Sequence, residues 1–267
     1  MATGQPTAIA FRNLAADGSA TILASSSLVL TPPSILQDPL IARKWRGRLG
    51  ESEYLTIDLG SAQEIDTVLL RGLNLTAAGV TRLRISTADT SAQDGSAYDS
   101  GAAAARVDPV YATLLFLLTV PVTGRYIRLD LNEPGADYIE AGRLAVFKRH
   151  VLEFGISFGP NYRWIDRSGE TESDGGQDYI DEDVSRRCWT MSIPLMSETF
   201  ANDVWDELDR TIGIRHDFLV IRNVNGANLG RDSLWGRRKQ IAGITQPNAF
   251  VDEHGAFSTS FEIYERL

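Results

Sequence analysis

Apolar and polar residues alternate with a period of two through much of the first 150 positions. In YLTIDLG (54–60), every second residue from Leu55 is apolar, and polar residues stand between them. This is the pattern of a β-strand with one buried face. Gly60 and Ser61 then predict a turn. A second strand is expected to begin at Ile65, because β-branched residues and short spacing favour strand over helix.

Further strand patterns fill the rest of this half. Segments with the same alternation, or with the continuous apolar run of a strand buried on both faces, are 81–87, 113–120, 124–131 and 141–149. Gly, Pro, Asp and Asn lie between them, and no convincing amphipathic helix interrupts the series. Many short strands separated by turn residues predict a β-sandwich or barrel.

The second half combines strands with one helix. Strand patterns occupy 187–195, 217–223, 237–245 and 256–265. Between them, the segment 197–213 has apolar residues at helical spacing: Phe200, Val204, Trp205, Leu208 and Ile212. Ser197 or Thr199 can cap the start of this helix, and Gly213 is expected to end it.

The expected fold is therefore mainly β, with two domains. Residues 1–150 are predicted to form a β-sandwich. Residues 151–267 are predicted to form a β-rich domain with one amphipathic helix at about 199–212. A chain of 267 residues is long enough for two such domains, since single cores tend to divide above roughly 250 residues.

Charge separates the two halves. Residues 1–150 hold 14 basic and 15 acidic residues, whereas residues 151–267 hold 12 and 20. Nucleic acid and anionic membranes require a basic face, so neither is an expected partner. The single cysteine, Cys188, excludes a disulfide within the chain.

Targeting signals are not evident. The N-terminal residues lack the basic and then apolar layout of a signal peptide. The longest apolar stretch, 111–122, is too short to span a bilayer, which takes about 20 residues. We therefore expect a soluble protein made in the cytoplasm.

Several segments of the first half together resemble a known family. ARKWRG (42–47), the Ile-Asp-Leu-Gly strand of 54–60, the Ile-x-x-Val that starts at Ile65 and GRYIRL (124–129) are similar to the discoidin-like, or galactose-binding-like, domains. The resemblance covers about residues 20–150. It implies a jelly-roll sandwich that binds glycans, lipids or proteins through loops at one end.

The resemblance also implies candidate ligand residues in the loops 43–50, 74–79 and 132–138. They are Arg43, Trp45, Arg46, Asn74 and Asn132. For Trp45, the role of a buried core residue is favoured over that of a sugar-stacking surface, because aromatic side chains chiefly supply buried area. Two family features are absent here: the cysteine pair that joins the termini, and the His-plus-Arg sugar clamp, since no histidine precedes His150.

An acidic segment stands out in the second half. Residues 168–183 hold seven carboxylates and no basic residue. Clustered carboxylates suit calcium, but the spacing is not that of a calcium loop, and a solvated, mobile loop is the simpler interpretation. A third interpretation is a salt-sensitive contact between neighbouring copies. The candidate residues for it are Asp178, Asp181 and Asp183 on one side, and Arg237, Arg238 and Lys239 on the other.

Catalytic and metal motifs find little support. GISFG (155–159) matches the Gly-x-Ser-x-Gly nucleophile elbow, but a proline stands where the required helix should begin, so Ser157 is expected to be an ordinary strand residue. His150, His216 and His254 lack zinc-binding spacing. We expect no catalysis, no cofactor and no metal.

The whole chain resembles tail-tip or baseplate proteins of tailed bacteriophages in its architecture, an analogy that no diagnostic motif supports. This implies a structural component of the virion, such as a distal tail protein. Its partners would be other tail proteins, its own copies in a ring, and host-surface glycans. The alternative is a free carbohydrate-binding module or lectin without catalytic activity. A hydrolase that uses Ser157 is a third class.

Overall fold

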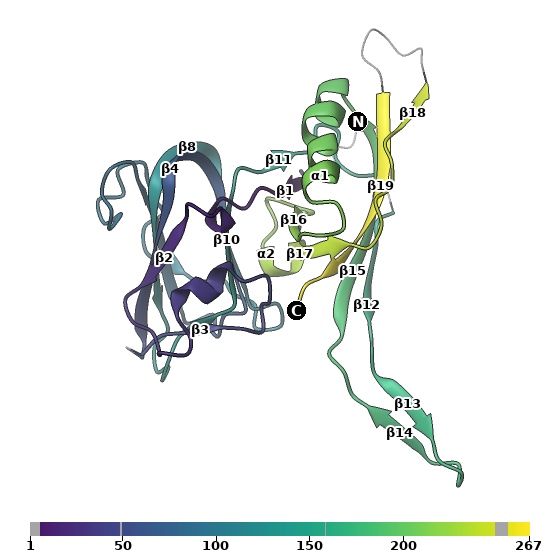
Figure 1. The fold of residues 1–267 in the computed structure, drawn as a ribbon, viewed down its shortest axis with the longest axis horizontal. Helices are drawn as coiled ribbons and strands as arrows, with labels where there is room; N and C mark the ends of the chain where they lie inside the picture. The colour runs from purple at the N-terminus through teal and green to yellow at the C-terminus, as the bar shows by residue number, and fades with distance from the viewer. Residues whose placement is uncertain (1–5, 49, 158, 249–255) are drawn as a thin grey trace. The chain divides into compact units, whose positions relative to one another are not determined.

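The computed structural model describes residues 6–48, 50–157, 159–248 and 256–267. Two compact units make up the chain (Figure 1). The sandwich unit comprises Ala8–His150 and Val220–Ser233, and the helix unit comprises Met1–Thr7, Val151–Leu219 and Leu234–Leu267. Residues 220–233, which follow the predicted helix in sequence, therefore belong to the same unit as the first half of the chain.

Two long strands form the frame of the sandwich unit. β4 (Ser52–Arg71) and β8 (Thr113–Asn132) each have 20 residues and pair antiparallel along their whole length. The register runs from Ser52 opposite Asn132 to Arg71 opposite Thr113. It shifts between Asp58 and Gln63, and again between Ile65 and Thr67.

The predicted turn at Gly60 and Ser61 is wrong. Gly60 has a φ of +79°, but the chain does not reverse there, and pairing with β8 resumes at Gln63. The segment is a bulge, which inserts extra residues and bends a strand without ending it. The predicted strands 113–120 and 124–131 likewise join into the single strand β8.

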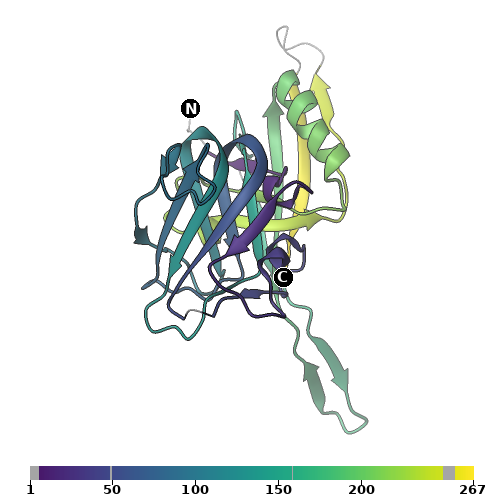
Figure 2. The same cartoon turned by 60° about the vertical axis from the view of Figure 1, so that its left-hand side comes forward.

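The other strands pair with different halves of this frame. β2 (Thr21–Ala24) pairs with the first half of β4, and β10 (Arg143–Phe147) pairs with the second half. The main path is β10-β4-β8-β5-β6, and β7 also pairs with β5. The bounds are Val80–Ser86 for β5, Tyr98–Asp99 for β6 and Ala103–Ala104 for β7. Figure 2 shows β4 and β8 arching over so that their halves lie in two layers.

Short elements complete the sandwich unit. β3 (Trp45–Arg46) pairs with β9 (Glu140–Ala141). The remaining elements are β1 (Ala8–Ala10), the 3-10 helices η1 (Leu14–Ala16) and η2 (Pro33–Gln37), β11 (His150–Val151) and the short helix α2 (Leu229–Asp232).

Burial differs between the two halves of β4. From Glu53 to Leu59, every second residue is buried, whereas all residues from Ile65 to Arg71 are buried. The first half therefore has one solvent face and the second half has none, as expected for strands at the surface and inside of a domain. The core holds side chains from both layers, including Leu55, Ile57, Ile127, Leu129, Leu144 and Val146.

The helix unit contains an antiparallel sheet that includes the order β17-β19-β15-β12, with β18 paired on β19. The bounds are Asn161–Ile165 for β12, Arg186–Met196 for β15, Phe218–Ile221 for β16, Ser233–Arg238 for β17, Thr245–Asn248 for β18 and Ala256–Glu265 for β19. β13 (Gly169–Glu172) and β14 (Asp178–Asp181) form a separate hairpin. The predicted strand at 237–245 is thus wrong beyond Arg238.

The predicted helix is confirmed. It consists of a π-helical segment, η3 (Phe200–Trp205), followed by α1 (Asp206–Thr211). The hydroxyl of Ser197 accepts a hydrogen bond of 3.1 Å from the Phe200 N–H. Gly213 has a φ of +53°, and its N–H donates to the Leu208 carbonyl at 3.1 Å. Within the described residues, no helix has the length and apolar composition needed to cross a bilayer.

A buried ion pair joins this helix to the sheet. Arg238 of β17 lies 2.6 Å from the Asp209 carboxylate, and its side chain is 0% exposed. The pair is not aligned as a hydrogen bond. The guanidinium carbon lies 5.9 Å from the Trp205 ring centroid and 5.6 Å from that of Phe218. Burial raises the pKa of Asp209, and the charge of Arg238 opposes this rise.

This environment predicts an asymmetric response to mutation. Asp209→Asn should lower the free energy of unfolding by about 3–5 kcal/mol, because it leaves the buried guanidinium without a counter-charge. Arg238→Met should cost only about 1–2 kcal/mol, since Asp209 still reaches solvent and the apolar replacement fits the aromatic surroundings. Urea unfolding followed by circular dichroism measures both values. Equal losses would contradict the prediction.

Candidate functional site

Trp45 lies in the core and not on a binding surface. It is 0% exposed, and its Nε1 donates to the Ser26 carbonyl at 3.1 Å. In β3 it stands opposite Ala141 of β9. Its indole faces are therefore not available to a sugar. Trp45 is therefore a buried core residue, and its prediction as a ligand residue is wrong.

Arg46 and Asn74 converge on the segment that precedes and begins β9. The Arg46 guanidinium lies 3.9 Å from the Tyr138 ring centroid and donates to Glu140 at 2.8 Å, and Lys44 donates to the same carboxylate at 2.6 Å. Asn74 donates to the Tyr138 carbonyl at 2.8 Å and accepts from the Glu140 N–H at 2.9 Å. Burial raises the pKa of Glu140, but the hydrogen bonds from Lys44 and Arg46 outweigh it and lower that pKa. The polar groups of this cluster serve mainly one another.

The two remaining candidates of the loop set have other surroundings. Arg43 pairs with Asp38 at 2.6 Å, and its side chain is 61% exposed. Asn132 ends β8, opposite Ser52 of β4 and Val80 of β5. The structure thus places Trp45, Arg46 and Asn74 around β3 and β9, and it gives Arg43 and Asn132 different partners.

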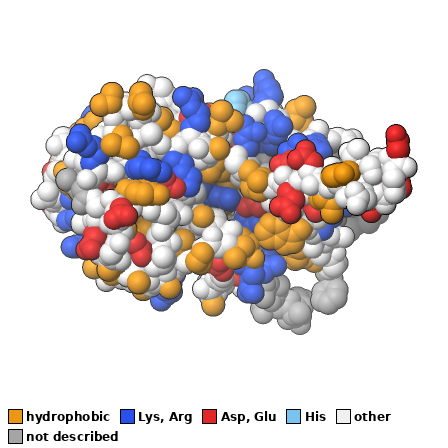
Figure 3. Space-filling view, turned by 90° about the horizontal axis from the view of Figure 1, so that it is seen from below, with side chains coloured by type: hydrophobic (Ala, Val, Ile, Leu, Met, Phe, Trp, Pro, Cys, Tyr) orange, Lys and Arg blue, Asp and Glu red, His pale blue; other side chains and the backbone are white. Residues whose placement is uncertain are grey.

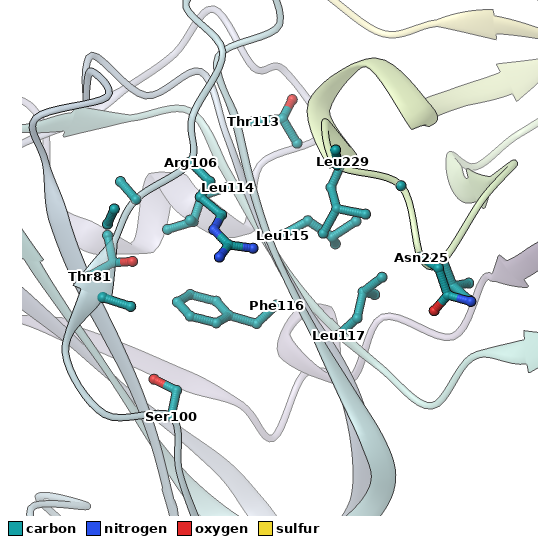
Figure 4. Close-up of a pocket in the computed structure, with 16 residues that line it drawn as sticks. Thr81, Ser100, Arg106, Thr113, Leu114, Leu115, Phe116, Leu117, Asn225 and Leu229 are labelled. Atoms are coloured by element: carbon teal, nitrogen blue, oxygen red, sulfur yellow. The ribbon is translucent and has the colours of Figure 1, made fainter.

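A cleft elsewhere in the sandwich unit was not foreseen from the sequence. It has a volume of about 410 Å³ and lies among β5, β8, the segment around β7 and residues 224–229 (Figure 4). Its lining includes Thr81, Ser100, Arg106, Phe116, Leu117 and Asn225. We call it the Arg106 cleft.

The Arg106 cleft combines an apolar floor with a few polar groups. Leu115 and Leu117 of β8 contribute to the floor, and Phe116 is partly buried against the sandwich core. In Figure 4, the Arg106 guanidinium and the Phe116 ring both project toward the middle of the cleft, and Asn225 lies at its far side. A concave surface that offers both apolar and polar groups can bind a small ligand.

One wall of the cleft is anchored by a contact across 120 positions of sequence. The Asn228 side chain donates to Asp108 at 2.7 Å and accepts from the Arg231 N–H at 2.9 Å, which also caps α2. Arg222 donates to Asp232 with its Nε at 2.8 Å. These contacts hold residues 224–229 beside β8. No local sequence pattern predicts the hydrogen bond between Asn228 and Asp108, because these residues are 120 positions apart in the chain.

The backbone beside the cleft is strained. Arg106, which lines the cleft, has a φ of +50°, and Ala112, directly before Thr113, has a φ of +44°. A residue with a Cβ rarely adopts this left-handed conformation, which costs of order 1–3 kcal/mol. Only three non-glycine residues in the described part of the chain do so, and two of them flank this wall. Strained backbone of this kind often marks functional sites.

Asp99 fixes another part of the cleft wall. It accepts hydrogen bonds from Arg82 Nε at 2.8 Å and from the Gly101 N–H at 2.9 Å. The bond from Arg82 is the main cause that lowers the pKa of Asp99 to about 2, and burial opposes it. Between these two contacts, the Ser100 hydroxyl accepts from the Leu83 N–H at 2.9 Å.

The predicted assembly residues separate into exposed and buried groups. Asp178 and Asp181 belong to the exposed strand β14, and Asp183 lies 3.5 Å from Arg167. The acidic segment is therefore a β-hairpin and not an irregular loop. Arg237 and Lys239 are exposed, and the Lys239 ammonium lies 4.3 Å from the Tyr264 ring centroid. Arg238 is buried against Asp209, so the structure removes it from the basic surface.

Ser157 does not stand in the strand–turn–helix setting of a nucleophile elbow. The Ser157 N–H donates to the Ser192 carbonyl at 2.8 Å, and the next element is strand β12, where a nucleophile elbow requires a helix. His150 stacks on Phe11 with ring centroids 5.3 Å apart. His254 lies outside the described residues. Among those that are described, no group of three or more His, Cys, Asp or Glu side chains is placed to hold a metal.

Comparisons with known proteins find similarity in solved structures. No family model matches the chain, and no curated protein matches it. A GH29 fucosidase of Ruminococcus gnavus in complex with fucose is 18% identical with a TM-score of 0.43, and the match covers 52% of this chain and 27% of that chain. The family 32 carbohydrate-binding module of Clostridium perfringens NanJ in complex with galactose is 12% identical with a TM-score of 0.41, over 53% and 99%.

A further C. perfringens module, CpGH89CBM32-5 in complex with GalNAc-β-1,3-galactose, is 16% identical with a TM-score of 0.42, over 51% and 99%. Each of these matches spans about half of this chain, and this chain spans about a quarter of the fucosidase. The comparisons give no support to the resemblance to bacteriophage tail-tip proteins.

The environment of Asp99 predicts its titration. In the wild-type protein, the carboxyl should titrate near 2, and in Arg82→Gln the midpoint should rise toward the ordinary value of 3.8. Because the folded pKa lies below the unfolded one, Asp99 contributes stability that is fully present above 3.8 and is lost as the pH falls toward 2. Carboxyl carbon shifts in NMR follow the titration. An unchanged midpoint in the variant would show that Arg82 is not the cause.

Proposed function

We propose that the sandwich unit is a saccharide-binding module without catalytic activity and that the Arg106 cleft is its binding site. The observation that carries this proposal is the placement of an exposed arginine, a partly exposed aromatic ring and an amide in one open concavity: Arg106, Phe116 and Asn225. The loop cluster around Arg46 supports this role less well, because its polar groups are engaged with one another.

The chemistry of the cleft suits a sugar. A saccharide presents hydroxyl pairs at its edge and apolar C–H groups on its faces. The fork of guanidinium donors can bind two neighbouring hydroxyl oxygens, and an amide offers both a donor and an acceptor. The Phe116 ring supplies an apolar surface for the C–H groups.

A second candidate function is assembly into a larger particle, and one observation favours it. All eight strand residues of the β13–β14 hairpin are exposed, including Tyr179 at 60% and Ile180 at 68%. An isolated two-stranded hairpin is marginally stable in water, and exposed large apolar side chains on it suit a protein contact. A structural role in a virion tail, with other tail proteins as partners, is the finer form of this candidate and still rests on the sequence analogy alone.

The saccharide proposal is tested by the binding of the full chain. A glycan array would identify the ligand, with galactose and fucose, the sugars named in two of the similar structures, among the first probes. For the sugar found, Arg106→Ala should weaken binding at least about tenfold, because it removes charge-assisted hydrogen bonds of about 1.5–3 kcal/mol. Isothermal titration calorimetry measures this change.

Arg46→Ala is the matched control for this measurement. It removes an arginine from the predicted loop surface of the same unit, and it should leave the affinity unchanged. If Arg46→Ala abolished binding while Arg106→Ala did not, the loop surface would be the site and the Arg106 cleft would not. Absence of binding to every glycan on the array would contradict the saccharide role itself.

A further inference from the structure

A second concave site, in the helix unit, is lined by arginines. It has a volume of about 220 Å³ and lies between the ends of β12, β15, β17 and β19. We call it the arginine pocket. Its polar lining residues are Arg167, Arg186, Arg237, Tyr264, Glu265 and Arg266.

The lining of the arginine pocket has four guanidinium groups and one side-chain carboxylate, and it also includes Leu267. Its one side-chain carboxylate, Glu265, accepts from Arg187 at 2.6 and 3.0 Å, and both of these side chains are 5% exposed. The negative charge of Glu265 is therefore already neutralised by Arg187. Arg266 lies 3.7 Å from Asp217, and Arg167 lies 3.5 Å from Asp183. Guanidinium groups clustered in this way favour an anionic partner with several carboxylates.

The acidic arm, residues 168–183, has the complementary charge. It holds seven carboxylates and no basic residue. In the hairpin register, Glu170 stands opposite Ile180 and Glu172 stands opposite Asp178. Residues that face each other across a ladder, and those two apart along a strand, share one face. Glu170, Glu172 and Asp178 therefore point the same way, with Ile180 among them.

The base of the arm meets the pocket of its own chain, where Asp183 lies 3.5 Å from Arg167, whereas β13 and β14 lie farther along the arm. It continues from β12 and β15, which pair from Asn161 opposite Thr190 to Ile165 opposite Arg186. Arg167 and Arg186 stand where the arm leaves the sheet, so the arm starts at the rim of the pocket. In Figure 1, β13 and β14 extend away from the sheet of their unit. The face seen in Figure 3 shows acidic side chains on this projecting part.

We propose that the arginine pocket binds the acidic arm of a second copy of this chain. The Glu170, Glu172 and Asp178 face of the arm pairs with the guanidinium groups, and Ile180 is covered in the contact. The two surfaces differ, so the contact is head-to-tail and produces a ring if the rotation closes, or a filament if it does not. The contact would serve the assembly role, the second candidate function, and it does not depend on saccharide binding.

Light scattering after size exclusion tests the contact with the full chain. At about 50 mM salt, where charges act over a longer range than at physiological salt, the protein should be larger than a monomer, and at about 1 M salt it should dissociate. Arg237→Glu, at an exposed pocket residue, should weaken self-association at least about tenfold, a loss of about 1.4 kcal/mol. Arg215→Glu changes the same charge on an exposed arginine of the helix unit outside the pocket, and it should not weaken association.

Complementation separates the proposed pairing from a general charge effect. The arm variant E172K/D178K should be monomeric alone, as Arg237→Glu should be. A mixture of the two variants should associate, because the intact arm of one fits the intact pocket of the other. Circular dichroism melts check that each variant is folded.

The remaining outcomes are decisive in different ways. A wild-type protein that stays monomeric at every salt concentration overturns both this contact and the assembly role. Self-association that neither pocket nor arm variants weaken, or that Arg215→Glu weakens equally, overturns the contact but leaves the assembly role standing. A monomer that binds inorganic phosphate, and loses it in Arg237→Glu, would instead make the pocket a small-anion site.

Discussion

The continuous pairing of β4 with β8 is the constraint on which the sandwich unit depends. Each strand has 20 residues, more than a flat half-buried strand can place against a single core. Register shifts near Gly60 and near Ile65 allow the pair to bend, so that its two halves serve as separate layers. The apolar faces of the two halves then bury one another. The positions of β2, β5 and β10 follow, because each pairs with one defined half of this frame.

The Arg106 cleft depends on this frame and on one long-range contact. The first half of β8 offers Leu115 and Leu117, and residues 220–233 return from the far end of the chain to lie beside them. The hydrogen bond of Asn228 to Asp108 joins the returning segment to the strained stretch that follows Arg106. The site is therefore composite: its aromatic ring and guanidinium come from one part of the chain and its amide from another.

In the helix unit, buried arginines are paired with carboxylates, whereas other charged side chains lie on the surface. Arg238 and Arg187 point inward, where Asp209 and Glu265 compensate them. Alternation along β17 leaves Arg237 on the opposite face, at the arginine pocket. The acidic residues of 151–267 are concentrated in the hairpin, which contains seven of the 20. Two separated surfaces of opposite sign on one unit are what a head-to-tail contact between copies requires.

Most of the local elements could be predicted from the order of the residues alone. Strand patterns predicted β5, β10 and the two halves of β4 as separate strands, and apolar residues at helical spacing predicted the helix with its Ser197 cap and its end at Gly213. It could not tell the bulge at Gly60 from a turn, since both use the same residues and only pairing with β8 decides. The buried role favoured for Trp45 is confirmed, but the burial of Arg238 and the approach of residues 224–229 to residues 100–117 were evident only in the tertiary structure. The local pattern of apolar residues indicates which face of a helix or strand is apolar. Burial of a side chain and the geometry of a site depend on residues that are far away in the sequence.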